Sequence, residues 1–255
     1  MFIIILITGA GISGCSGRAE RSTSEKAAEA EAESDIEKSL QIKQEVYSFK
    51  VEGFGKGKKI QWTLEGESAN VISDKINIAN LKAVYYGDDM TFTIFADKAV
   101  YDKKTQDVEL LDNIVGKTSD GGELSTDYAR WSAKTEEIST DYYVTVTREN
   151  ISCRGKGVVT KPRLKQAVFS EDVEVNISPD RRITCNGPFE IDHDKCVAIF
   201  NNNVKIADNN SQTLTDRLTV YLDPKTNKIV KVVTEGRVEI VHKGGDIENI
   251  GEITF

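Results

Sequence analysis

The sequence predicts an all-β protein with an elongated, repetitive fold, and three observations favour this class. A unit of about 30 residues recurs from Trp62 to Ile240. Within the units, apolar and polar residues alternate with the period of a strand that buries one face. Helical periodicity is nearly absent after residue 45. Such units cannot bury their apolar faces alone, so they must stack into one long domain with a continuous interior.

Two sets of markers define the repeat. Turn residues follow one another at spacings of 28, 32, 28, 30 and 31, at Asp74, Asp102, Lys134, Pro162, Asp192 and Asp223. The strand after each turn contains an apolar marker, and these markers recur at a similar spacing along the sequence. They are Leu81, Ile114, Val144, Val173, Val204 and Val238. Because stacked repeats share one core, we expect the function to lie in the interior that these strands enclose.

The N-terminus predicts an export signal. Residues 1–14 are largely apolar and fall short of the ~20 residues that a membrane-spanning helix needs. They end in Ile12-Ser13-Gly14, and Cys15 follows, a pattern that resembles the bacterial lipobox. The resemblance implies that Cys15 is lipidated and anchors the protein to a membrane, with the inner membrane favoured. Because no Lys or Arg precedes the run, an uncleaved anchor is an alternative, and a chance cysteine is another.

Residues 15–45 predict a tether between this anchor and the folded domain. The segment is rich in Ala and Glu and lacks an apolar face that could dock it. We expect it to be flexible or helical.

Strands follow from Tyr47 onward. Tyr47, Phe49 and Val51 alternate with polar residues before a glycine-rich turn, and Trp62 and Leu64 share one face of the next strand. The same alternation recurs in Phe92/Ile94/Ala96, Val108/Leu110, Val173/Val175/Ile177, Phe189/Ile191, Val204/Ile206 and Leu218/Val220/Leu222. Turns such as Asp102–Thr105 separate these strands with residues that favour hairpins.

Composition and motifs argue against nucleic-acid binding and catalysis. The net charge of −8 argues against a nucleic-acid partner, which needs a basic patch. His193 and His242, the two histidines, stand beside no candidate nucleophile, and no glycine-rich phosphate loop opens a helix. The acidic pairs Asp88-Asp89 and Glu136-Glu137 lack the spacing of a calcium loop. We therefore expect no enzyme activity, no metal and no cofactor.

Three cysteines follow Cys15: Cys153, Cys185 and Cys196. Cys153 and Cys185 hold the same place in successive repeats. Stacked strands lie ~4.8 Å apart, within the range that a disulfide spans. A disulfide is therefore possible, but two thiols that pack as small apolar side chains are the commoner outcome.

The apolar face itself is the remaining candidate site. The interior positions selected are Phe49, Trp62, Leu64, Val71, Ile76, Ile78, Phe92, Ile94, Tyr101, Leu110, Leu124, Trp131, Ile138, Val144 and Val146. They line an ordinary core if the walls of the fold close, and a groove for hydrocarbon if the walls diverge. The sequence leaves both outcomes open.

Several segments resemble a known family. From about residue 46 to 178, the chain resembles the periplasmic lipopolysaccharide-export protein LptC, on Trp62–Ala69, Ala96–Asp102, Leu110–Ile114, Leu124–Tyr128 and Thr140–Val144. Residues 179–255 resemble the related LptA (OstA-like) module, on Ile183–Asp192, Ala198–Val204, Leu214–Asp223 and Glu235–Ile240.

This resemblance implies a V-shaped β-jellyroll of two antiparallel sheets that carries the acyl chains of lipid A across the periplasm. The implied partners are lipopolysaccharide, an inner-membrane ABC transporter of the LptBFG type, and an LptA-like bridge protein that pairs edge strands with this chain. The edge near Tyr47–Val51 would face the transporter, and the strands near Val238–Phe255 the next module. The alternative function is that of a structural or adhesive surface lipoprotein with a closed core and no lipid cargo.

Overall fold

The computed structural model describes residues 44–54, 59–87, 90–161, 165–224, 226, 228–242 and 247–250. The predicted signal, Cys15 and the tether up to residue 43 lie outside the described residues. Within the described part every helix or strand is a strand: β1 (Gln44–Phe54), β2 (Ile60–Ile72), β3 (Lys75–Tyr86), β4 (Thr91–Asp102), β5 (Val108–Thr118), β6 (Glu123–Ser132), β7 (Glu137–Arg148), β8 (Ile151–Lys161), β9 (Gln166–Ile177), β10 (Arg181–Cys185), β11 (Phe189–Asp192), β12 (Val197–Ala207), β13 (Ser211–Leu222), β14 (Ile229–Glu235), β15 (Val238–His242) and β16 (Ile247–Ile250).

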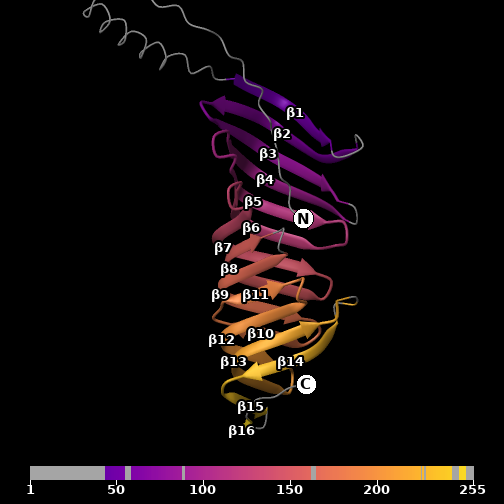
Figure 1. The fold of residues 1–255 in the computed structure, drawn as a ribbon, viewed down its shortest axis with the longest axis vertical. Helices are drawn as coiled ribbons and strands as arrows, with labels where there is room; N and C mark the ends of the chain where they lie inside the picture. The colour runs from indigo at the N-terminus through magenta and orange to yellow at the C-terminus, as the bar shows by residue number, and fades with distance from the viewer. Residues whose placement is uncertain are drawn as a thin grey trace, which may run out of the picture.

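The strands form one antiparallel ladder that follows the order of the chain. Each strand from β1 to β9 pairs with the next, and the path continues from β10 through β12, β13, β15 and β16. The short strands β11 and β14 extend the ladder beside β10 and β15, because β11 pairs with β9 and β12, and β14 pairs with β13. The result is the long stack in Figure 1, which confirms the predicted elongated all-β fold. The two predicted sheets are two halves of one hydrogen-bonded sheet.

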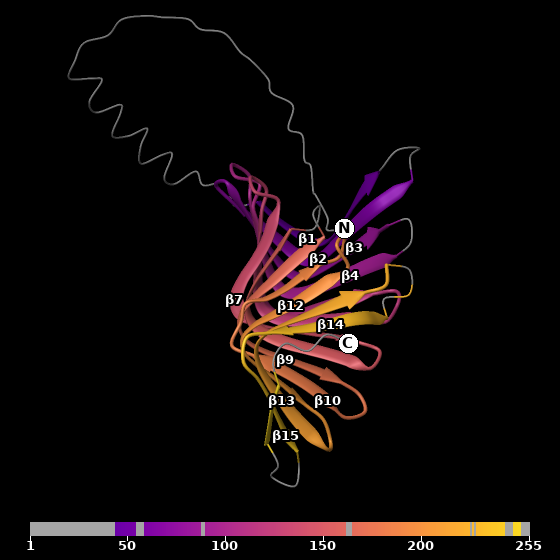
Figure 2. The same cartoon turned by 60° about the horizontal axis from the view of Figure 1, so that its bottom comes forward.

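The long strands bend near their middle, so each contributes to two walls. Residues in the left-handed backbone region mark many of the bends, among them Asn80, Asp112, Asn113, Asn202 and Asn203. Asn and Asp tolerate this conformation better than other residues that carry a Cβ atom. Figure 2 shows the strands fanning out from the bends.

We call the two walls A and B. Wall A contains the short strands β10, β15 and β16, together with those halves of the longer strands that continue the same rows of pairing. Wall B contains β11, β14 and the other halves. In β3, for example, Leu81–Tyr86 belong to wall A and Lys75–Ala79 to wall B.

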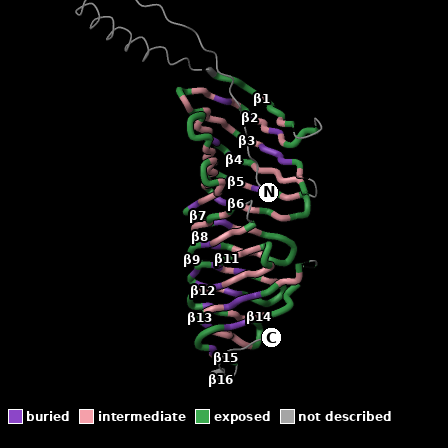
Figure 3. The backbone as a smooth tube through the Cα atoms, viewed as in Figure 1, coloured by how far each residue is buried: buried purple, intermediate pink, exposed green. Residues whose placement is uncertain are grey.

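The apolar markers of the repeat line up along the bends. Each is exposed by 5% or less, and each stands one or two residues after a bend: Leu81, Ile114, Val144, Val173, Val204 and Val238. Figure 3 shows such buried positions recurring along the stack. The repeat therefore marks the line where walls A and B join, and this line is tightly packed over the whole length from β3 to β15.

The cysteines decide between the two outcomes that the sequence left open. Cys153 and Cys185 are free thiols, on β8 and β10. Each repeat contains two strands, so β9 lies between them, and strands two steps apart are separated by about 9.6 Å, too far for a disulfide. Burial raises the pKa of Cys153 to about 12, and the nearby Cys185 adds to this shift. The two side chains therefore pack as small apolar groups.

Candidate functional site

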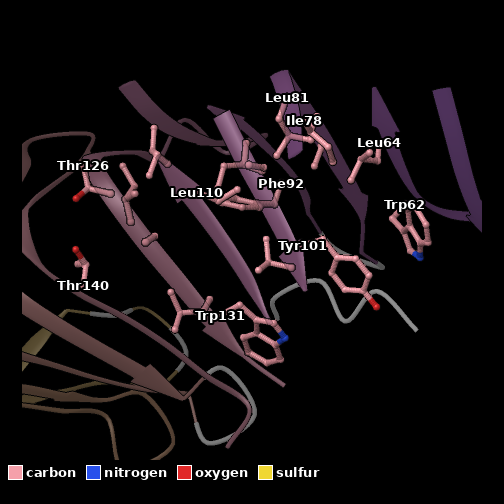
Figure 4. A pocket seen from close by; sticks show the side chains of 18 of the residues that line it. Trp62, Leu64, Ile78, Leu81, Phe92, Tyr101, Leu110, Thr126, Trp131 and Thr140 are labelled. Carbon is pink, nitrogen blue, oxygen red and sulfur yellow. The ribbon is translucent and has the colours of Figure 1, made fainter. Parts of the chain in front are cut away.

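A cavity of about 310 Å³ lies between walls A and B, over the first eight strands. Its lining begins at Phe49 on β1 and ends at Val158 and Thr160 on β8. Most of the lining side chains remain partly exposed, so the walls diverge here and do not close on each other. The first half of the fold therefore forms a groove, which Figure 4 shows from close by.

Most of the predicted interior residues line this groove: Phe49, Trp62, Leu64, Ile76, Ile78, Phe92, Ile94, Tyr101, Leu110, Leu124, Trp131, Ile138 and Val144. Val71 and Val146 do not. Val71 pairs with the groove residue Ile76 next to the turn between β2 and β3, and Val146 packs against the closed core of the second half.

The candidate list omitted a second set of lining residues, of which only Val51, Leu81, Val108 and Ile114 had been recognised in the strand pattern or as repeat markers. The set is Val51, Ala69, Leu81, Ala83, Ala99, Gln106, Val108, Ile114, Thr126, Ala129, Ser139, Thr140, Val158 and Thr160. Many of these are small or carry a hydroxyl group, so they do not stand out in an apolar pattern. Their common signal is alternation in phase with a larger apolar neighbour, as Ala99 alternates with Tyr101.

The chemistry of the lining is that of a hydrocarbon site. None of the described residues that line the groove is charged, and the polar ones are Gln106, Ser139 and three threonines. Trp62, Tyr101 and Trp131 stand near strand ends, so their rings mark the mouth of the groove (Figure 4). Aromatic side chains with one polar atom suit such a boundary between an apolar interior and water.

Charged groups near the mouth are held in ion pairs. Arg130 contacts Asp107 at 2.8 Å, beside Trp131, and Lys104 contacts Asp74 at 2.5 Å, beside the turn after Tyr101. The hydrogen bond from Lys104 lowers the pKa of the Asp74 carboxyl group. Within each pair the opposite charges neutralise each other, and both lysine and arginine side chains remain exposed.

The second half of the fold is filled. From β7 to β13 a buried cluster joins the walls: Val144, Phe169, Val173, Val175, Ile183, Cys185, Phe189, Phe200, Val204, Leu218 and Val220. Three of its aromatic rings form a stack, with centroids 5.7 Å apart for Phe169 and Phe189 and 4.2 Å apart for Phe189 and Phe200. The predicted continuous interior is therefore a groove in one half and a closed core in the other.

The comparison with known families follows from this geometry. Residues 3–178 match a protein family described as lipopolysaccharide-assembly, LptC-related. The chain belongs to the LptC-related family. The match covers more than half of the chain and ends just after β9. No individual curated protein matches the chain.

Membership confirms the resemblance to LptC and places this LptC-related chain in the transport and assembly of lipopolysaccharide. Among the described residues no helix is both long and apolar enough to cross a membrane. The same part of the chain contains no group of three or more His, Cys, Asp or Glu side chains arranged to hold a metal ion.

Proposed function

We propose that this LptC-related chain binds the acyl chains of lipid A in the groove and transfers lipopolysaccharide across the periplasm, as a component of the export bridge. The observation that carries the proposal is the groove between β1 and β8, whose described lining is apolar and uncharged. A structural or adhesive lipoprotein would need the walls to close over these strands as they do from β9 onward.

The size of the groove suits hydrocarbon. Eight stacked strands are separated by seven steps of about 4.8 Å, so the groove is about 34 Å long. One leaflet of a bilayer core is about 15 Å thick, which is the reach of a single acyl chain. Each buried CH₂ group contributes about 0.8 kcal/mol, so a dozen contribute about 10 kcal/mol before the costs of binding.

The proposed transfer needs no covalent step. The chain acts as a carrier, not as an enzyme, and needs no cofactor, because burial of the acyl chains supplies the affinity and an ATP-driven inner-membrane transporter of the LptBFG type supplies the work. An apolar lining without charges holds hydrocarbon without a directional contact, so the cargo slides instead of being locked in place.

The two ends of the ladder are the proposed contact sites for protein partners. Among the described strands β1 has one neighbour, β2, and this edge strand carries exposed apolar side chains such as Val46 and Tyr47. An exposed edge of this kind pairs with a strand of another protein, here the transporter. The strands β15 and β16 would pair with an LptA-like bridge protein. Lipidated Cys15 would hold the chain at a membrane, most simply the inner one.

Photo-crosslinking in cells tests the proposal. A crosslinking residue at Trp62 or Ile94, both in the groove, should capture lipopolysaccharide, and one at the exposed Lys103 should not. Absence of capture at both groove positions, in a folded and membrane-bound protein, would contradict the proposal and favour the scaffold function.

A further inference from the structure

The aromatic side chains that line the groove from wall A lie against glycines. There are three of them in the lining: Phe49, Trp62 and Phe92. Each has a glycine on the neighbouring strand, either directly opposite or one diagonal step away: Gly66 for Phe49, Gly53 for Trp62 and Gly116 for Phe92. The aromatic residues that wall B contributes, Tyr101 and Trp131, stand at the mouth instead.

The contacts leave no space for a side chain at the three glycines. A Cβ atom added at each position would meet the nearest ring atom at 2.0 Å for Gly53, 2.6 Å for Gly66 and 2.9 Å for Gly116. Carbon atoms in contact are about 3.5 to 4.0 Å apart. An alanine at any of these positions would therefore displace the ring.

The need for space, and not the backbone conformation, accounts for these glycines. They lie within β1, β2 and β5, and their φ values are ones that residues with a Cβ atom also adopt. Glycine inside a strand weakens the strand, and it often marks the close approach of another group. An aromatic ring that covers the glycine offsets part of this loss.

The pair of Phe92 and Gly116 shows what the glycine provides to the groove. Phe92 is on β4 and Gly116 on β5, and the far edge of the ring, at Cζ and Cε2, reaches the glycine. The ring therefore extends along wall A toward the neighbouring strand instead of pointing across to wall B. Gly116 is buried beneath the ring, whereas Phe92 is partly exposed and lines the cavity. With the wall behind it, a displaced ring moves into the groove.

We propose that Gly53, Gly66 and Gly116 set the width of the groove, because they hold the aromatic rings of wall A along the wall and out of the space for hydrocarbon. This inference rests on the proposed function and deepens it. None of the three glycines is itself in the lining of the groove, so they act as positioning residues. The rings offer a large apolar surface to an acyl chain, and the glycines keep that surface from narrowing the groove.

Leu110 provides a probe position on the opposite wall. It lines the groove from wall B and lies on β5, the same strand that contains Gly116 in wall A. A photo-crosslinking residue at Leu110, in the full-length protein in cells, should capture lipopolysaccharide. Gly116→Ala should lower this capture at least threefold, because the added methyl group pushes the Phe92 ring into the groove.

The Phe92→Leu background separates displacement of the ring from a general loss of stability. Leucine has no ring to displace, so addition of Gly116→Ala to this background should leave capture within about twofold of Phe92→Leu alone. Lys117→Ala changes an exposed side chain next to Gly116 on the same strand, and it should leave capture within about twofold of the unaltered protein. Urea denaturation of each variant identifies those that are folded.

A second pair provides the same test if Gly116→Ala does not fold. Gly53 lies on β1, which is at the edge of the described ladder. Gly53→Ala should lower capture at Ile76, a lining residue of wall B, at least threefold. The same substitution in the Trp62→Leu background should change capture by less than about twofold.

Unchanged capture at Leu110 in a folded Gly116→Ala protein would contradict the proposal, and so would a loss of capture that persists in the Phe92→Leu background. Either result would leave the proposed function intact, because the unaltered protein still captures lipopolysaccharide. Background signal at Leu110, Ile94 and Trp62 in the unaltered protein would instead contradict the proposed function, and the inference about width would fall with it.

Discussion

The two halves of this molecule share one backbone ladder and differ in what fills it. From β1 to β8 the walls enclose a cavity of about 310 Å³, and from β9 to β13 the corresponding space is a buried core. The line of bends is equally buried in both halves, at Leu81 and Ile114 as at Val204 and Val238. The difference therefore lies away from the bends, in the side chains that extend from one wall toward the other.

Wall B differs more than wall A. One inner row of wall A alternates large and small residues in the first half, with Leu64, Ala83, Ile94, Gly116 and Leu124, and it holds Val175, Ile183 and Ile206 in the second. The corresponding row of wall B alternates in the same way in the first half, with Ala69, Ile78, Ala99, Leu110 and Ala129, but it holds the three phenylalanines Phe169, Phe189 and Phe200 in the second. The comparison indicates that residue volume in the rows of both walls, without a change of topology, distinguishes the groove from the core.

The largest expected difference between the halves follows from a buried charge. Val204→Asp places a carboxylate where the side chain is fully buried, which should lower the free energy of unfolding by about 5 kcal/mol. Ile94→Asp faces the groove, where water reaches the carboxylate, and should cost about 1 to 2 kcal/mol. Urea denaturation of both variants measures the difference, and equal costs would mean that the first half is closed as well.

Removal of an aromatic ring should also destabilise the second half more than the first, with a smaller change in the free energy of unfolding. Phe200→Ala removes a ring that is 3% exposed and should cost about 4 kcal/mol, because it leaves a cavity. Phe92→Ala removes a partly exposed groove residue and should cost about 1 kcal/mol. Thermal denaturation compares the two, with the same substitution at each site as the control. A cost at Phe92 as large as at Phe200 would contradict the description of the groove as open.

Thiol reactivity sharpens the comparison along wall A. Cys153 and Ile94 belong to the same row, but Cys153 packs against the closed cluster, and burial raises its pKa to about 12. At pH 8 its thiolate fraction is about a thousandfold lower than that of a thiol with the ordinary value of 9.0. Iodoacetamide, followed by peptide mass spectrometry, should therefore modify an Ile94→Cys variant rapidly and Cys153 very slowly.

The same thiol predicts the pH dependence of stability. The folded protein holds the Cys153 proton more tightly than the unfolded chain, so this contribution is complete below pH 9 and is lost as the pH rises from 9 toward 12. A Cys153→Ala variant should lose less stability across this range. Parallel denaturation curves for both proteins from pH 9 to 11 would contradict the prediction, as would rapid modification of Cys153 at pH 8.

The smallest effects are expected at the bends, and they should be equal in both halves. Asn113 and Asn203 have φ values of 49° and 56°. A valine there should lower the free energy of unfolding by about 1 to 2 kcal/mol at either site, because a β-branched side chain disfavours this conformation. Glycine variants serve as controls and should stay close to the unaltered protein. A much larger cost at one site would mean that the bends also contribute to the difference between the halves.

Much of the fold could be predicted from local patterns. The alternation around Trp62 and Ile94 identified inner faces correctly, and the spacing from Leu81 to Val238 identified the line of bends, because both depend only on the two-residue period of a strand. The lining contributed by Ala99, Ala129 and Thr140 was missed, since small side chains carry little apolar signal. The disulfide that the sequence left possible is absent between Cys153 and Cys185, because equal places in successive repeats are two strands apart, not one.

The sequence by itself determined the β class, the repeat and the side of each strand that turns inward. Only the tertiary structure decided whether the inner sides meet. That outcome depends on side chains that approach each other from opposite walls, such as Phe169 beside Gly155, and on the row of volumes that runs across many strands. Local alternation records the direction of each side chain, whereas the gap between two walls is set by the sum of many side chains distant in sequence.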